Sequence, residues 1–376
     1  MDRDWAALPR EILNLVVERL ETPKEFSFVC RSWRSAAKDI QTHCAVTTAP
    51  MILISADAEK DEWHLYNPVD DKVLKTQLNL RRQRFCGSSK GWLIVVDEKR
   101  VVSLINPFLF GVGGRRDHEK SIIRLPPVSP ADLNQLHHGF FLVYEATISE
   151  DPILNADNCI VMVMFAKLAF IRLNKDSNWT YFPETETVER RRFFIVQVLK
   201  VEDRFYLVDH FRQLYSFDVT TQSVSPVKKV VFREYVLDVD YMRKEYLVVC
   251  NEKTILMVRR YMARYDYHGT KTKRFKVSEL NISKGEWTEK NTLGDVALFL
   301  GKSSSISVCA SESGYRANCI YFIHDHPAFG PSRAFDYGIY SVEERRLLEN
   351  PFHRDAGTLM SKTDVPPIWI LPTYNL

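Results

Sequence analysis

Six pairs of short apolar runs follow one another along most of the chain, and a polar turn separates the two runs of each pair. Runs rich in β-branched and aromatic residues that alternate with turn residues predict β-strands. The pairs recur with a period of roughly 40 to 45 residues, which, at about four strands per unit, is typical of a β-propeller. They begin at Met51, Trp92, Cys159, Phe205, Tyr246 and Cys319.

The spacing of these pairs predicts six blades, with seven as the alternative. Trp179-Thr180 and Trp287-Thr288 begin two predicted outer strands, and the apolar run 367–371 is a predicted strand that completes the first blade. Such a closure would remove an open sheet edge. The intervals are longer where loops intrude, and residues 111–120 and 264–273 are two such predicted loops.

The N-terminal segment shows a different, helical periodicity. Positions 12, 13, 16, 17 and 20 are apolar at helical spacing, and Pro9 suits a first helical turn. Thr22 and Glu25 form a predicted capping box, so that a second helix follows at once. Segments of about 40 residues seldom bury enough surface to be stable alone. Either a partner protein or the rest of the chain must therefore cover these helices.

This segment resembles the F-box motif in Leu8-Pro9, Ile12-Leu13, Val29-Cys30-Arg31 and Trp33-Arg34. The resemblance implies that the segment binds a Skp-type adaptor and, through it, a cullin. It also implies that nine residues divide between the core of the module and the adaptor interface, and the sequence does not apportion them further. They are Leu8, Pro9, Ile12, Leu13, Val16, Leu20, Val29, Cys30 and Trp33.

The region 273–325 resembles a domain of unassigned function that follows the F-box in plant proteins of the Skp-interacting-partner type. The similarity lies in 273–277, 284–287, 293–301, 305–311 and 318–322. We therefore expect a mainly β protein with a small α module: a three-helix F-box at residues 1–40, followed by a propeller-like, substrate-recognition domain at residues 41–376.

Composition limits the partners and the compartment. The formal net charge of +3 gives no reason to expect a nucleic-acid or membrane partner. The seven cysteines are scattered and never spaced Cys-x-x-Cys, which favours reduced thiols. No apolar signal core opens the chain. We expect a soluble protein of the nucleus or cytoplasm that is not secreted.

Three motifs suggest chemistry, and each has a simpler structural interpretation. Residues 87–91 match Gly-x-Ser-x-Gly, but a strand rather than a helix is predicted to follow. Gly301-Lys302-Ser303 lacks the earlier glycine of a phosphate-binding loop. His324 and His326 share one strand face, yet no third metal ligand is identifiable. We therefore predict no catalytic residue, no metal and no cofactor.

Basic clusters at 81–84, 115–116, 190–192, 259–260 and 271–276 are expected in solvated loops. If two or three shared one rim of the propeller, they could recruit an acidic target or an importin.

The leading hypothesis is a non-catalytic, substrate-recognition subunit of a Skp–cullin–F-box E3 ubiquitin ligase, which holds an unknown target protein for ubiquitination and proteasomal degradation. One alternative is a propeller enzyme or small-molecule receptor with structural N-terminal helices. Another is an F-box protein that acts outside any ligase, through adaptor binding alone.

Overall fold

The computed structural model divides the chain into two compact units, Ala49–Pro372 and a second that comprises Met1–Thr48 with Thr373–Leu376. The structure describes residues 8–9, 12–13, 33, 49–57, 61–78, 80, 83–109, 121–128, 143, 145–165, 168–181, 195–202, 204–209, 214–221, 223–226, 241–251, 253–265, 269–302, 304–325, 336–349, 357–358, 360 and 365–372.

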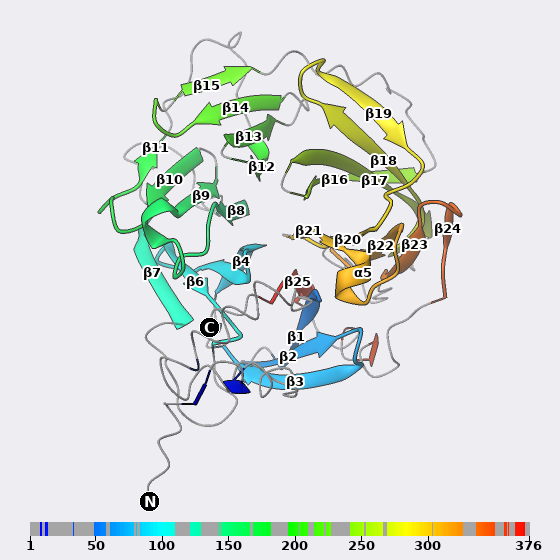
Figure 1. The fold of residues 1–376 in the computed structure, drawn as a ribbon, viewed down its shortest axis with the longest axis horizontal. Helices are drawn as coiled ribbons and strands as arrows, with labels where there is room; N and C mark the ends of the chain where they lie inside the picture. Colours follow the sequence, from blue (N-terminus) through cyan, green and yellow to red (C-terminus); the bar gives the residue numbers. More distant parts are fainter. Residues whose placement is uncertain are drawn as a thin grey trace, which may run out of the picture. The chain divides into compact units, whose positions relative to one another are not determined.

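The larger unit is a ring of six β-sheets, the blades of a propeller (Figure 1). Blade 1 contains, from the inside outward, β25 (Ile368–Ile370), β1 (Met51–Asp57), β2 (Glu62–Asn67) and β3 (Lys72–Gln77). Blade 2 contains β4 (Arg84–Ser89), β5 (Trp92–Val96), β6 (Val101–Ile105) and β7 (Ile122–Pro127). Blade 3 contains β8 (Glu145–Ile148), β9 (Ile160–Met164), β10 (Leu168–Arg172) and β11 (Thr180–Tyr181).

The remaining three blades complete the ring. Blade 4 contains β12 (Ile195–Val201), β13 (Arg204–Asp209), β14 (Leu214–Asp218) and β15 (Ser223–Pro226). Blade 5 contains β16 (Tyr241–Cys250), β17 (Thr254–Tyr265), β18 (Gly269–Asn281) and β19 (Glu286–Lys290). Blade 6 contains β21 (Ser305–Cys309), β20 (Val296–Leu300), β22 (Cys319–Phe322), β23 (Gly338–Ser341) and β24 (Arg346–Leu347).

Blade 6 departs from the pattern of the other five. The chain enters it at β20, turns inward to β21 and returns through the short helix α5 (Ala310–Ser313), so that β22 pairs with β20 in parallel. A second short helical element, the 3-10 turn Ala156–Asn158, lies between β8 and β9. In the part of the chain that the structure describes, no helix is both long enough and apolar enough to cross a membrane.

Each blade is buried on both faces because two neighbouring blades cover it. All five residues of β5 are buried, and alternate side chains of a strand point to opposite faces. Trp92 and Ile94 accordingly pack into the core between blades 2 and 3, whereas Leu93 and Val95 pack into the core between blades 1 and 2. Such double burial explains the near-continuous apolar runs in the sequence.

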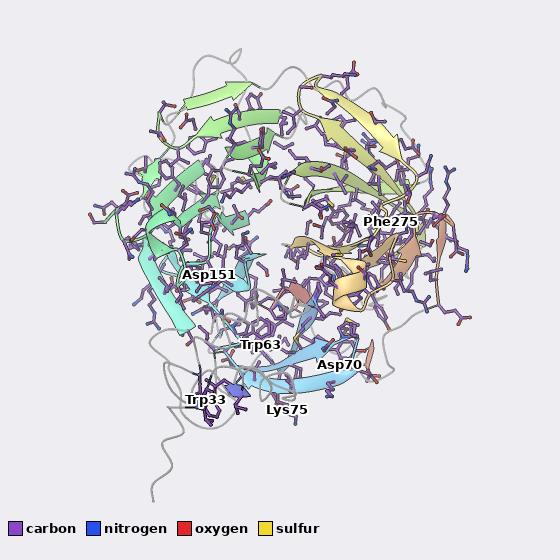
Figure 2. The ribbon with its side chains drawn as sticks, in the orientation of Figure 1. Trp33, Trp63, Asp70, Lys75, Asp151 and Phe275 are labelled. Atoms are coloured by element: carbon purple, nitrogen blue, oxygen red, sulfur yellow. The ribbon has the colours of Figure 1, made fainter. Side chains whose placement is uncertain are left out.

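Six apolar cores result, one at each junction between blades. Between blades 5 and 6, for example, the ring of Phe275 lies 5.2 Å from those of Phe322 and Tyr340, centroid to centroid (Figure 2). Between blades 1 and 2, Trp63 meets Phe85 edge to face at 5.2 Å. The stability of the ring therefore comes mainly from contacts between blades.

Hydrogen bonds also cross the junctions. The indole of Trp92 donates to Asp151 across blades 2 and 3 at 3.1 Å. Further bonds run from Lys200 Nζ to the Ser149 carbonyl (3.1 Å), from Gln197 Nε2 to the Leu247 carbonyl (3.1 Å), from Ser307 Oγ to the Val249 carbonyl (2.7 Å) and from the Tyr315 hydroxyl to the Pro50 carbonyl (2.6 Å).

The C-terminal strand closes the ring. Met51, Ile52 and Leu53 of β1 pair with Ile370, Trp369 and Ile368 of β25. Trp369 is fully buried, and its ring lies 4.8 Å from that of Phe299 in blade 6. The prediction that the run 367–371 completes the first blade is confirmed.

The predicted six blades are likewise confirmed, and the seven-bladed alternative is wrong. The predicted loop at 264–273 is wrong in most of its length, because β17 extends to Tyr265 and β18 begins at Gly269. The two strands pair with each other over this extension, which satisfies their backbone groups without a loop.

Candidate functional site

The N-terminal unit supplies the first candidate surface. Ile12 and Leu13 are helical, and both of their amides donate to the Pro9 carbonyl at 3.1 Å, so a turn begins at Pro9. Leu13 is only 2% exposed, whereas Ile12 is 43% exposed. Adjacent residues of a helix point about 100° apart, so one helix can bury Leu13 and present Ile12.

Five of the nine residues predicted to bind an adaptor are described. Besides Ile12 and Leu13, Leu8 is half-buried, Pro9 is exposed, and Trp33 is helical and half-buried. The other four, Val16, Leu20, Val29 and Cys30, lie outside the described residues. The adaptor-binding role of all nine stays a prediction.

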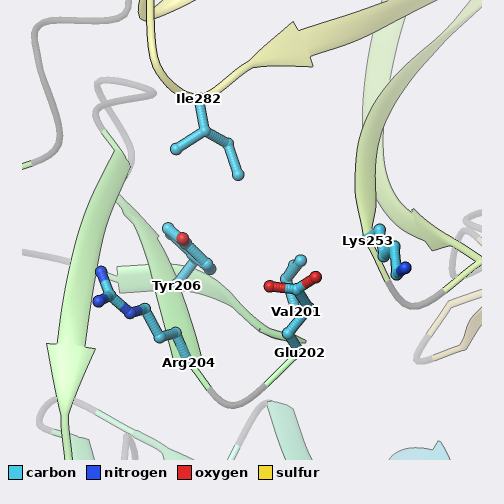
Figure 3. A pocket seen from close by; sticks show the side chains of 6 residues that line it. All are labelled: Val201, Glu202, Arg204, Tyr206, Lys253 and Ile282. Carbon is cyan, nitrogen blue, oxygen red and sulfur yellow. The ribbon is translucent and has the colours of Figure 1, made fainter.

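A pocket of about 380 Å³ between blades 4 and 5 is the second candidate surface (Figure 3). Its lining comes from three hairpin turns and from Tyr206 of β13. Both signs of charge line it, together with two aliphatic side chains. The other lining residues are Val201, Glu202, Arg204, Lys253 and Ile282. The pocket therefore presents two cations, one carboxyl group and one phenol beside its apolar side chains.

The Gly-x-Ser-x-Gly motif forms a strand, a turn and a second strand. Ser89 ends β4, Lys90 and Gly91 turn with positive φ, and Trp92 begins β5. The Ser89 hydroxyl donates to the Ile148 carbonyl at 3.3 Å. The motif thus serves a hairpin, as the sequence predicts.

Buried thiols near this hairpin are poor nucleophiles. Burial raises the pKa of Cys86 and of Cys159 to about 12, against smaller opposing effects of Arg84 on Cys86 and of a hydrogen bond with the Glu150 backbone on Cys159. Both therefore stay protonated at neutral pH, and a thiol is far less nucleophilic than a thiolate.

Within the His324-Asp325-His326 motif, Asp325 forms an ion pair with Lys244. Its carboxylate accepts from the Tyr246 hydroxyl at 2.5 Å and pairs with Lys244 Nζ at 2.7 Å. His326 lies outside the described residues. Among those described, no three His, Cys, Asp or Glu side chains are grouped so that they could hold a metal ion.

Asp325 belongs to a buried ionic cluster centred on Arg260, which is 1% exposed. The guanidinium donates from Nη2 to Asp336 at 2.9 Å, from Nε to Thr272 Oγ1 at 2.7 Å and from Nη1 to the Tyr246 hydroxyl at 3.2 Å. Thr272 in turn donates to Asp336 at 2.6 Å. The cluster joins β16, β17 and β18 of blade 5 to residues that follow β22 and precede β23 in blade 6.

Attraction between opposite charges keeps Asp325 and Arg260 ionised although both are buried. Burial acts to raise the pKa of Asp325, but Arg260 and Lys244 outweigh it and hold the pKa below its ordinary value. Burial likewise acts to lower the pKa of Arg260, and Tyr246, Asp325 and Asp336 outweigh it so that the pKa rises. The N–H groups of the Arg260 guanidinium are hydrogen-bonded within the cluster. Arg260 therefore links two blades and is not available to bind a ligand.

The basic cluster 271–276 lies within β18 and not in the expected solvated loop. The expectation that the basic pair Arg259-Arg260 lies in a solvated loop is also wrong. Both residues lie within β17 and are buried. The sequence contains one signal for this, since Arg260 shares a strand face with Val258 and Met262, which are apolar and buried. Its acidic partners lie 65 and 76 residues away, and no sequence pattern joins them to Arg260.

Comparison with known proteins matches the propeller to a family. A family model described as KIB1-4 beta-propeller matches residues 65–341. The Arabidopsis thaliana protein named F-box protein At2g26160 is 23% identical over 342 residues, covering 85% of this chain and 95% of its own length. Putative F-box/kelch-repeat protein At5g24040, also from Arabidopsis thaliana, is 23% identical and covers 98% of both chains.

A third Arabidopsis relative, F-box protein SKIP23, is 23% identical and covers 82% of this chain and 81% of its own. These relatives confirm the resemblance to plant F-box proteins with a C-terminal propeller-like domain. Because the family model matches most of the length of this chain, the chain belongs to the KIB1-4 beta-propeller family.

Proposed function

We propose that the protein is the substrate-recognition subunit of a Skp–cullin–F-box E3 ubiquitin ligase. The observation that carries this proposal is the match to a protein named as an F-box/kelch-repeat protein along 98% of the chain, which includes most of its N-terminal part. The helical turn at Pro9, with Ile12 exposed, supports it.

In this proposal residues 1–40 bind a Skp-type adaptor and, through it, the cullin, while residues 41–376 hold the target protein. The subunit contributes no acid, base or nucleophile. It raises the local concentration of the target near a ubiquitin-charged enzyme, and proximity of this kind accelerates transfer without local chemistry. The complex would act in the nucleus or the cytoplasm.

The adaptor interface would centre on apolar side chains that the N-terminal unit leaves accessible. Ile12 is the best candidate because it is apolar and 43% exposed. Leu8 and Pro9 precede it on the same turn, and the remaining predicted residues are Leu13, Val16, Leu20, Val29, Cys30 and Trp33. Buried Leu13 would support the module from within.

Co-purification of the full chain with a Skp-type adaptor tests the interface. Ile12→Asp places a charge on the apolar surface and should weaken adaptor binding at least tenfold, because burying an unpaired charge in an interface is costly. The double variant Leu8→Ala, Pro9→Ala should also reduce recovery of the adaptor.

Leu74→Asp is the matched control, since Leu74 on β3 is also an exposed aliphatic residue, 50% exposed. It should leave adaptor recovery unchanged. Equal recovery with Ile12→Asp and with the control would show that the assigned interface is wrong.

Target binding needs a separate experiment. Proteins that co-purify with the full chain in cells whose ligase activity is blocked would be compared with those captured by a chain lacking residues 1–40. Candidate substrates should be retained by the shortened chain, whereas the adaptor and cullin should be lost. Loss of every captured protein on deletion would contradict target binding by the propeller.

A further inference from the structure

The pocket between blades 4 and 5 is built from turns that are closed by their own hydrogen bonds (Figure 3). In the turn from β16 to β17, the Lys253 amide donates to the Cys250 carbonyl at 3.2 Å. In the turn from β18 to β19, the Gly285 amide donates to the Asn281 carbonyl at 2.8 Å. The strands beside the third turn, β12 and β13, pair with each other up to the turn itself. The walls are therefore formed before a ligand arrives, which lowers the entropic cost of binding.

The floor of the pocket belongs to the apolar core between blades 4 and 5. Val201 and Tyr206 are members of that core and are only 5% and 7% exposed, and Ile282 packs against it. A ligand in the pocket thus meets a phenol ring and two aliphatic side chains that a close-packed core holds in place.

Three charged side chains line the pocket and reach water, namely Glu202, Arg204 and Lys253. Two cations and one carboxylate leave an excess of one positive charge in the lining. In the view of Figure 3, Arg204 and Lys253 lie on opposite sides of Tyr206. The pocket therefore attracts a ligand group with one negative charge.

A carboxylate suits this lining better than a phosphate group does. The guanidinium of Arg204 has paired N–H donors whose geometry matches that of a carboxylate. A carboxylate also balances the single excess charge, whereas a phosphate monoester carries about −1.5 to −2 at pH 7 and would leave negative charge beside Glu202. The oxygens of Glu202 can in turn accept from N–H groups of the ligand.

The volume of the pocket limits the size of the ligand. At about 380 Å³ it lies near the lower end of the range for ligand pockets, roughly 300–1,000 Å³. A few adjacent side chains of an extended segment fill such a space.

We infer that the pocket between blades 4 and 5 binds a short segment of a partner protein in which an Asp or Glu side chain lies next to an aliphatic one. The carboxylate pairs with Arg204, and Lys253 adds attraction from the other side. The aliphatic side chain packs against Tyr206 and Ile282. The inference rests on the proposed function only in assigning the segment to a target of the ligase, because the binding itself needs no adaptor.

Selection of random heptapeptides displayed on phage, with the full chain as bait, tests the site. We expect the enriched peptides to carry Asp or Glu next to Leu, Ile or Val. An enriched peptide and its twin, with Asn for Asp or Gln for Glu, are then labelled and titrated with the full chain at constant ionic strength, and fluorescence anisotropy measures binding. The twin should bind about tenfold more weakly, because it loses a charge-assisted hydrogen bond.

Variants of the lining connect this binding to the pocket. Arg204→Gln should weaken binding of the enriched peptide about tenfold, and Lys253→Gln should weaken it less. Glu202→Gln should strengthen binding, because it removes a like charge near the bound carboxylate. Since all three residues are exposed, the variants should fold normally. Lys99→Gln, which removes one charge from the exposed turn between β5 and β6, should bind like the wild type.

Failure to enrich acidic peptides would overturn the inference, and so would equal binding of the peptide by the wild type and by Arg204→Gln. Displacement of the peptide by inorganic phosphate but not by acetate would also overturn it, because the pocket would then be a phosphate site. Recovery of the adaptor is measured separately. Loss of peptide binding with normal adaptor recovery would contradict only this inference, whereas the reverse result would contradict only the proposed function.

Discussion

Arg260 of β17 and Asp336, 76 residues later, form a buried ion pair at 2.9 Å that joins blade 5 to blade 6. The pair is shielded from water, with side-chain exposures of 1% and 8%. The guanidinium also stacks over the Phe322 ring, 4.6 Å from its centroid. A charge placed so deeply is tolerated only when its partners are all present.

Arg260→Met should therefore destabilise the propeller by about 3–5 kcal/mol, because it leaves the Asp336 carboxylate buried without its counter-ion. Urea unfolding followed by tryptophan fluorescence measures the change. Arg346→Met is the control, since Arg346 pairs with Glu344 on the surface and should contribute less than about 1 kcal/mol. Similar losses for the two variants would contradict a special role for the buried pair.

Gly87 marks the closest approach of two inner strands. A Cβ on Gly87 would lie 2.1 Å from the backbone oxygen of Ala146 in β8. Gly87→Ala should thus force β4 and β8 apart and cost at least about 3 kcal/mol, the upper part of the range for overpacked sites.

Gly294→Ala separates this clash from backbone strain. Gly294 has a φ of +65°, and no atom lies within 4 Å of the position that a methyl group would take, so only the left-handed conformation is penalised, by roughly 1–2 kcal/mol. Chemical unfolding of both variants should rank Gly87→Ala as the more damaging. The reverse order would mean that the inner strands can separate at little cost.

Truncation of the C-terminal strand should open the ring. A chain that ends at residue 366 lacks β25, leaves β1 without its inner neighbour and removes the fully buried Trp369. We expect loss of cooperative thermal unfolding, together with protease sensitivity in blade 1. A chain that ends at Pro372 keeps β25 and is the control, and equal behaviour of the two chains would exclude closure by β25.

The sequence predicts the second and third strands of most blades far better than the inner strands. β5 and β6 are apolar on both faces because blades cover both sides, and this produces runs that are easy to recognise. β4 and β8 begin with Arg84 and Glu145 and contain few consecutive apolar residues. Each of these strands has a covering blade on both sides, but its polar residues interrupt the apolar run that would mark it in the sequence.

The ionic cluster centred on Arg260 could not be derived from the sequence either. Arg260 belongs to a recognisable basic pair, but its acidic partners Asp325 and Asp336 lie 65 and 76 residues further along the chain. Their proximity depends on the packing of blade 5 against blade 6. The order of blades follows from periodicity, whereas the side chains that converge depend on strand register and twist.

Burial of Glu145 makes the stability of the propeller depend on pH. Its pKa in the folded state is about 8, above its ordinary value of 4.5, and burial is the main cause. Between about pH 4.5 and pH 8, the carboxyl group of Glu145 is protonated in the folded chain and ionised in the unfolded chain. The stabilisation is complete below about pH 4.5, and it is lost as the pH rises toward 8.

Glu145→Gln keeps a neutral, hydrogen-bonding side chain and removes this titration. The free energy of unfolding of the variant, relative to that of the wild type, should therefore increase with pH by up to roughly 1.4 kcal/mol per unit across this window. Urea unfolding at pH 5, 6, 7 and 8 measures the difference. Glu98→Gln, in the exposed turn between β5 and β6, controls for the loss of one negative charge. If the difference between Glu145→Gln and the wild type does not change from pH 5 to 8, the carboxyl group of Glu145 is not held neutral in the folded protein.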